Sequence, residues 1–195
     1  LNEEHTDDFY KSAGLELTGN DVYHKLPWLK RIQSRMPWLL LGLVGGISTA
    51  YIIKIFESTI ATQLIIASFI PAVVCLSDAV GNQSEMIYIR TFGKKRTSLW
   101  SYLGGELGVA SVIGSLLAFI MFTVSYVWIG NATVSIILAL SIIVTVYCSV
   151  FIAVFLPWMF ERLGFDPAVT SGPLATVIYD ISSIIIYLSI ASLII

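Results

Sequence analysis

The sequence predicts an all-α integral membrane protein with five transmembrane helices. Of its 195 residues, 56% are hydrophobic and 12% are charged, and the mean hydropathy is +0.84. A soluble domain carries about 25% charged residues. No charged residue occurs from Leu107 to Phe160, a stretch more than twice as long as the roughly 20 residues that cross a bilayer core. The net charge of -2 offers no basic surface, so we expect no nucleic-acid partner, and the composition excludes a soluble enzyme.

Five apolar runs are long enough to be these helices. Each approaches or exceeds the length that a bilayer core requires. The runs cover residues 37–56, 59–80, 103–129, 132–160 and 167–195. Because five is an odd number, the two ends of the membrane part are expected on opposite sides of the lipid bilayer.

Basic residues predict which side is cytoplasmic, since Lys and Arg near span ends stay in the cytoplasm. Ten of the 11 basic residues precede the first run or lie between the second and third or the fourth and fifth runs. Lys54 is the exception. We therefore predict a multi-pass protein of the cell membrane with a cytoplasmic N-terminus and an external C-terminus.

Small residues on the first and third runs have the spacing of helix packing motifs. Gly42 and Gly46 lie four residues apart on the first run, and Gly104 and Gly108 do so on the third. Glycines at this spacing let helix backbones approach closely in lipid. We expect these four positions to be helix contacts.

The second run ends in a polar cluster, residues 77–85, that contains Asp78, Asn82 and Glu85. If the helix continues through the cluster, these three side chains share one face; if it breaks at Gly81, backbone carbonyls are freed. Both versions supply oxygen ligands. We expect Asp78 to line a polar path, whereas Gln83, Ser84 and Glu85 fit ordinary polar residues at the end of a span.

The fifth run carries a carboxylate near the middle of the membrane. A charge at that depth costs about 2.5 to 3.5 kcal/mol, so Asp180 calls for an explanation. It belongs to a stripe of oxygen-bearing side chains at helical spacing, Thr176, Asp180, Ser183 and Tyr187. No Lys or Arg within a span core can pair with it. We predict that this stripe faces a wet path.

Together these side chains favour a hard divalent cation. Carboxylate, amide and hydroxyl oxygens suit Mg²⁺, Mn²⁺ or Ca²⁺, and Mg²⁺ is usually held through one or two carboxylates while it keeps several waters. If two copies met with their fifth helices facing, two Asp180 carboxylates would supply the charge for one such ion. A two-fold dimer is also the commonest assembly.

The chain resembles the MgtE family of magnesium channels and transporters in three membrane stretches. Residues 35–41 resemble the beginning of that family's first span, and residues 71–90, around Gly81-Asn82-Gln83-Ser84, resemble its second. Residues 163–167, followed by Ser171-Gly172-Pro173, Thr176 and Asp180, resemble its fifth. Residues 3–14 look like the acidic helix that joins the family's cytosolic regulatory part to its pore.

The resemblance implies a homodimer with a Mg²⁺ pore along the dimer axis. Asp180 would hold a hydrated ion, and Asn82 and Thr176 would line the pore. It also implies a cytosolic acidic connecting helix and linker at residues 1–34, a pore domain at residues 35–195, and a cytosolic regulatory domain preceding Leu1. Where the family usually has Gly-Gly-Asn, this chain has Ser77-Asp78-Ala79, which adds a carboxylate. Asp78 and Asp180 are therefore our candidates for successive parts of one cation path.

Two other functions remain open at this point. A secondary carrier would couple divalent cations to protons or Na⁺ through Asp78 or Asp180. A non-transporting membrane anchor would dock a cytosolic partner through residues 1–35, although the polar stripe on the fifth run speaks against it. An enzyme is not expected, because no His lies in the spans and no nucleophile accompanies the carboxylates.

Overall fold

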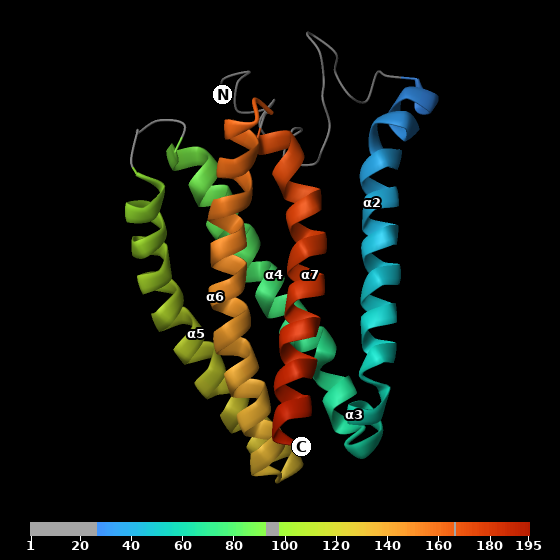
Figure 1. The fold of residues 1–195 in the computed structure, drawn as a ribbon, viewed down its shortest axis with the longest axis vertical. Coiled ribbons are helices and arrows are strands. Elements are labelled where there is room, and N and C mark those ends of the chain that lie inside the picture. The colour runs from blue at the N-terminus through green and yellow to red at the C-terminus, as the bar shows by residue number, and fades with distance from the viewer. Residues whose placement is uncertain (1–26, 93–97, 166) are drawn as a thin grey trace.

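The computed structural model describes residues 27–92, 98–165 and 167–195, and every regular element among them is a helix (Figure 1). The elements are α2 (Trp28–Ile55), α3 (Glu57–Thr62), α4 (Ile65–Phe92), α5 (Leu99–Ile129), α6 (Ala132–Arg162) and α7 (Pro167–Ile194). Residues 1–26, which include most of the predicted connecting helix, lie outside the described residues.

The prediction of an all-α protein with five long apolar helices is confirmed. Five helices are long and apolar enough to cross a bilayer, namely α2, α4, α5, α6 and α7. They run alternately up and down the bundle, so α2 begins and α7 ends at opposite ends (Figure 1). The first of them, α2, begins at Trp28, upstream of the residue 35 at which we expected the membrane part to start.

The second span differs from its predicted bounds of residues 59–80. Residues 57–62 form the short helix α3, and Gln63 ends this helix with an extended backbone conformation, φ -142° and ψ 89°. The membrane helix α4 then begins at Ile65 and continues without a break through Gly81 to Phe92. The hydropathy pattern missed this extension because polar side chains at positions 82–85 end the apolar run but not the helix. Asp78 consequently lies near the middle of α4.

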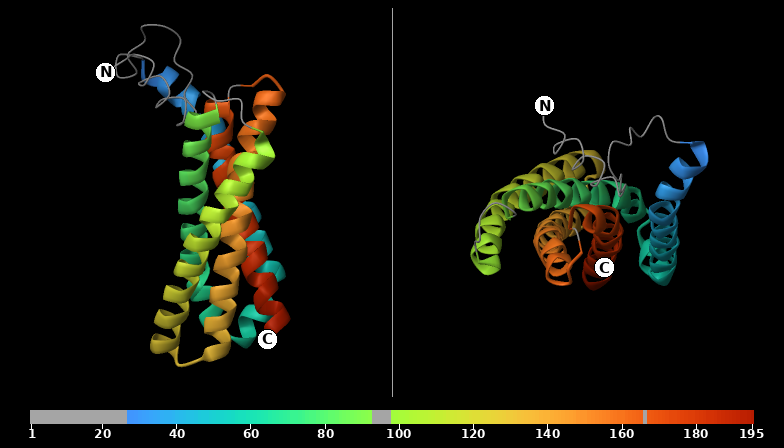
Figure 2. Two further views of the ribbon diagram at one scale, coloured as in Figure 1. Left: turned by 90° about the vertical axis from the view of Figure 1, so that its left-hand side faces the viewer. Right: turned by 90° about the horizontal axis from the view of Figure 1, so that it is seen from above.

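Helix α6 forms the core of the bundle. It packs against α4, α5 and α7, and α4 runs obliquely behind α6 and α7 (Figure 2). Its buried side chains include Ile137, Leu138, Ile142 and Val146. Leu138, Ile142 and Val146 follow one another every four residues, as expected of a helix that contacts a neighbour along its length. The uncharged stretch seen in the sequence thus includes the most enclosed helix of the bundle.

Helix α2 stands at the edge of the bundle and packs against α7 (Figures 1 and 2). The close approach occurs at Gly45, where an added Cβ would lie 2.6 Å from Val177 Cγ1. The predicted contacts at Gly42, Gly46, Gly104 and Gly108 are wrong within the subunit, since a Cβ there would meet no described atom within 4 Å. Spacing alone cannot say which face of a helix meets a neighbour, and the face of α2 that meets α7 carries Gly45.

Candidate metal centre

Asp78 and Asp180 lie together between α4 and α7. Each is close to the middle of its 28-residue helix, and their carboxyl groups are near enough to interact electrostatically. Asp78 Oδ1 is buried and makes no hydrogen bond within the described part of the chain. Two carboxylates held this close repel each other unless a positive charge lies between them. The pair is therefore suited to hold a cation or a shared proton.

The rotation of α7 decides which of its side chains can reach this place. The row that faces the interior contains Ala175, Tyr179, Ser183, Tyr187 and Ala191, all of them buried. Thr176 and Asp180 occupy the adjoining row and are partly exposed. Thr176 Oγ1 donates a hydrogen bond to the Gly172 carbonyl, 3.2 Å away, so its hydroxyl proton is already engaged. Its oxygen lone pairs stay available as acceptors.

The predicted polar stripe on the fifth span is wrong beyond Asp180. Ser183 and Tyr187 are fully buried. Ser183 Oγ donates to the Asp180 carbonyl at 3.0 Å, and the Tyr187 hydroxyl donates to the Ile66 carbonyl at 2.9 Å. Ser183 and Tyr187 belong to the buried row of α7, whereas Thr176 and Asp180 lie in the adjoining, partly exposed row.

On α4 the polar cluster divides in an unexpected way. Asn82 and Gln83 are exposed on the subunit surface, whereas Ser84 and Glu85 are buried. The prediction that Ser84 and Glu85 are ordinary polar residues at a span end is wrong, because α4 continues past them. Glu85, only 3% exposed, accepts a hydrogen bond from the Tyr179 hydroxyl at 3.2 Å.

Sequence reasoning missed Tyr179 entirely. Its ring lies against Gly81, where an added Cβ would come within 2.7 Å of Tyr179 Cζ. Gly81 therefore has a packing role within the helix. Nothing in the sequence pairs these residues, although a glycine in a membrane helix is a signal that a neighbouring helix can approach closely there.

The candidate site offers carboxylate oxygens, which hard cations prefer. Its ionisable groups are two aspartates, and the described residues contain no cluster of three or more His, Cys, Asp or Glu side chains. Two carboxylates are too few to strip an ion of its water but enough to hold a hydrated Mg²⁺. Such a site suits an ion that passes through better than one that is permanently bound.

Comparison with known families decides the relationship. Residues 70–190 match the model of the MgtE family, described as divalent cation transporters. The chain belongs to the MgtE family. The matched region contains both aspartates, Asn82 and Thr176, and the resemblance inferred from the sequence is confirmed. Membership in this family agrees with the expectation of a multi-pass membrane protein that is not an enzyme.

Individual MgtE relatives match nearly the whole chain. The magnesium transporter MgtE of Thermus thermophilus is 28% identical over 199 residues, and that of Bacillus subtilis is 29% identical over 192. The MgtE magnesium transporter of Enterococcus faecalis is 28% identical over 196 residues. These alignments cover 97% to 99% of this chain but 42% to 43% of the relatives, so the chain spans less than half of their length.

Proposed function

We propose that this chain carries divalent cations, Mg²⁺ before Mn²⁺ or Ca²⁺, across the cell membrane along a path that passes Asp78 and Asp180. The observation that carries the proposal is the convergence of these two carboxylates from the middles of α4 and α7. Charged groups at membrane depth are costly and mark ion pathways. The names of the relatives, all magnesium transporters, favour Mg²⁺ as the substrate.

Four side chains line the proposed path, and they have two different roles. Asp78 and Asp180 hold the hydrated cation by charge. Asn82, one turn beyond Asp78 on α4, and Thr176, one turn before Asp180 on α7, offer neutral oxygens that exchange hydrogen bonds with the ion's water shell. Neutral oxygens beside a charged pair let the ion leave as well as enter, which conduction requires.

A second copy of the chain completes the path in this proposal. Asn82 is exposed on the subunit surface and lies ten residues before the end of α4, about 15 Å of helix rise. An amide facing hydrocarbon at that depth would be costly, whereas a partner subunit or water would satisfy it. A two-fold homodimer that joins the α4 and α7 surfaces around one axis would cover Asn82, Thr176 and Asp180 together.

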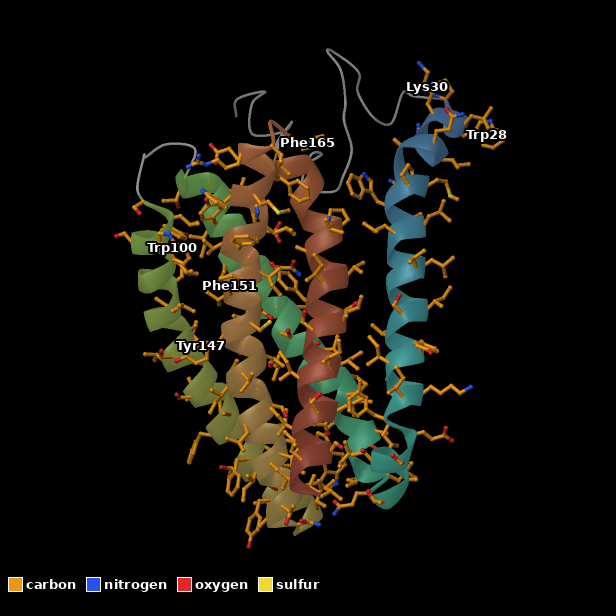
Figure 3. The ribbon with its side chains drawn as sticks, in the orientation of Figure 1. Trp28, Lys30, Trp100, Tyr147, Phe151 and Phe165 are labelled. Carbon is orange, nitrogen blue, oxygen red and sulfur yellow. The ribbon has the colours of Figure 1, made fainter. Side chains whose placement is uncertain are left out.

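The orientation in this proposal has the beginning of α2 in the cytoplasm. Lys30, Arg31 and Arg35 near the start of α2, Arg90 near the end of α4 and Arg162 at the end of α6 share one end of the bundle, and Figure 3 labels Lys30 there. Lys54 lies at the other end. The connecting helix and linker at residues 1–34, with a cytosolic regulatory domain preceding Leu1, complete the proposal, since the relatives are more than twice as long as the matched part.

Liposome uptake tests the proposal. Purified protein should admit Mg²⁺, with Mn²⁺, Ca²⁺ and Co²⁺ compared in parallel, and Asp180→Asn should lose uptake because the substitution removes the central charge but keeps the side-chain size. Glu57→Gln is the matched control, as it removes one carboxylate from the exposed helix α3. Uptake by Asp180→Asn equal to that of Glu57→Gln would refute the role of Asp180.

One observation favours a coupled carrier as the second candidate. Two neighbouring carboxyl groups that interact electrostatically can hold one proton between them, which an entering cation would displace. Mg²⁺ uptake should then respond to a pH difference imposed across the liposome membrane at constant voltage. A channel would show no such dependence.

A further inference from the structure

Tyr179 is the residue immediately before Asp180, and it is fully buried. Neighbouring residues of an α-helix point about 100° apart. While Asp180 turns toward Asp78 and the partly exposed side of α7, Tyr179 therefore turns inward onto α4. Whatever holds Tyr179 also sets the direction in which Asp180 points.

The ring of Tyr179 rests on bare backbone. An ideal Cβ on Gly81 would approach Tyr179 Cζ to 2.7 Å and Cε2 to 2.8 Å, distances that real Cβ atoms do not show. The ring therefore occupies space that exists because residue 81 has no side chain. Since Gly81 is close in sequence to Asp78, this contact joins α7 to α4 within one helical turn of the aspartate pair.

The hydroxyl of Tyr179 is anchored as well. It donates to Glu85 Oε2 at 3.2 Å, and Glu85 is 3% exposed. A buried carboxylate that loses a hydrogen-bond donor is strongly destabilised, so this bond resists displacement. The hydroxyl also lies within electrostatic reach of Asp78. Tyr179 thus stands between the buried Glu85 and the aspartate pair.

We propose that Tyr179 is a positioning residue for Asp180: its ring on Gly81 and its hydroxyl on Glu85 set the rotation of α7 and hence the distance between the Asp78 and Asp180 carboxylates. The inference rests on the proposed cation path. The distance between the two charges sets which hydrated ion fits, because Mg²⁺ keeps its waters in a compact, near-ideal octahedral shell whereas Ca²⁺ has a larger and more variable one. Tyr179 therefore governs ion preference without touching the ion.

The test compares two tyrosines of α7 that both bond to α4. Tyr179→Phe and Tyr187→Phe each remove one hydroxyl from a fully buried ring. The first substitution removes the hydrogen bond to Glu85, and the second removes the hydrogen bond to the Ile66 carbonyl. Both variants should lose thermal stability in detergent. In liposomes, Tyr179→Phe should raise the half-saturating Mg²⁺ concentration roughly three- to tenfold and reduce the preference for Mg²⁺ over Ca²⁺, whereas Tyr187→Phe should change neither.

A second variant keeps the inference testable if Tyr179→Phe does not accumulate. Gly81→Ala removes no hydrogen-bonding group, but its Cβ pushes the Tyr179 ring away from α4. This variant should therefore also reduce the preference for Mg²⁺ over Ca²⁺. If Tyr179→Phe, Gly81→Ala and Tyr187→Phe have the same half-saturating Mg²⁺ concentration and the same ion preference, the positioning role of Tyr179 is wrong. Uptake by the wild type would still support the transport function in that case. Absence of uptake by the wild type, together with absence of Mg²⁺-dependent thermal stabilisation, would overturn both.

Discussion

At the scale of single residues, the membrane carboxylates of α4 and α7 have different surroundings. Asp78 and Asp180 face each other and are partly accessible, whereas Glu85 is buried and accepts the Tyr179 hydroxyl. A carboxylate that is enclosed among neighbouring helices fixes structure, whereas a partly exposed carboxylate can be reached by a ligand. Burial, more than residue type, separates the two roles.

The pair makes a prediction about Asp78. Asp78→Asn should retain Mg²⁺ uptake with a half-saturating concentration about tenfold higher, because one carboxylate can hold a hydrated Mg²⁺ but with less charge. Concentration-dependent uptake in liposomes measures this shift. Asp78→Glu, which keeps the charge, should fall between Asp78→Asn and the wild type. An unchanged half-saturating concentration in Asp78→Asn would remove Asp78 from the path.

At the scale of elements, helix contacts in this bundle depend on which face each helix turns to its neighbour. Gly45 meets Val177, and Gly81 meets Tyr179, whereas a Cβ on Gly42 or Gly46 would meet nothing within 4 Å. Adjacent glycines such as Gly45 and Gly46 have the same composition and hydropathy but point in directions about 100° apart. The close packing of α2 on α7 therefore requires a glycine at position 45 but not at position 46.

That contrast gives a stability prediction for α2. Gly45→Val should destabilise the protein by about 1 to 3 kcal/mol, since its Cβ would start 2.6 Å from Val177 Cγ1 and the two helices would have to separate. Thermal unfolding in detergent measures the loss, and Gly46→Val is the matched control with open space around it. Pairing Gly45→Val with Val177→Ala should recover part of the stability. Equal unfolding temperatures for the two glycine variants would contradict the packing of α2 on α7.

At the scale of the whole molecule, the subunit encloses its core around α6 and leaves polar groups of the proposed path at its surface. Asn82 is exposed and Thr176 and Asp180 are partly exposed, all within membrane helices. Lipid cannot hydrogen-bond these groups. The surface that carries them therefore needs either water or a second protein surface against it, and our proposed homodimer supplies both.

Cross-linking tests this assembly. Asn82→Cys, made in a chain with Cys75→Ser and Cys148→Ser, should join two subunits through a short thiol-reactive linker in membranes, because the proposed axis brings the two copies of this residue together. Val127→Cys on α5, a position that is 80% exposed, is the control and should remain monomeric on denaturing gels. Cross-linking at Val127→Cys without cross-linking at Asn82→Cys would contradict the proposed interface.

Much of the architecture could be predicted from local pattern. Five long apolar runs became five helices, since length and hydropathy alone decide whether a segment can satisfy its backbone in lipid. The second span was the exception. Its apolar run ends before Asn82, but α4 continues to Phe92, because polar side chains end an apolar run without ending a helix. On this continuation Glu85 is buried and accepts a hydrogen bond from Tyr179 of α7.

By itself the sequence determined that this chain is a membrane protein of a particular family, that it has five segments long enough to cross a bilayer, and that some of these segments carry carboxylates, which are costly in lipid. Only the tertiary structure decided that Asp78 meets Asp180, that Tyr187 belongs to the core, and that Tyr179 bonds to Glu85. Hydropathy and composition are properties of one segment at a time. Contacts between α4 and α7 depend on the tilt and rotation of two helices far apart in the chain, which packing of the whole bundle sets.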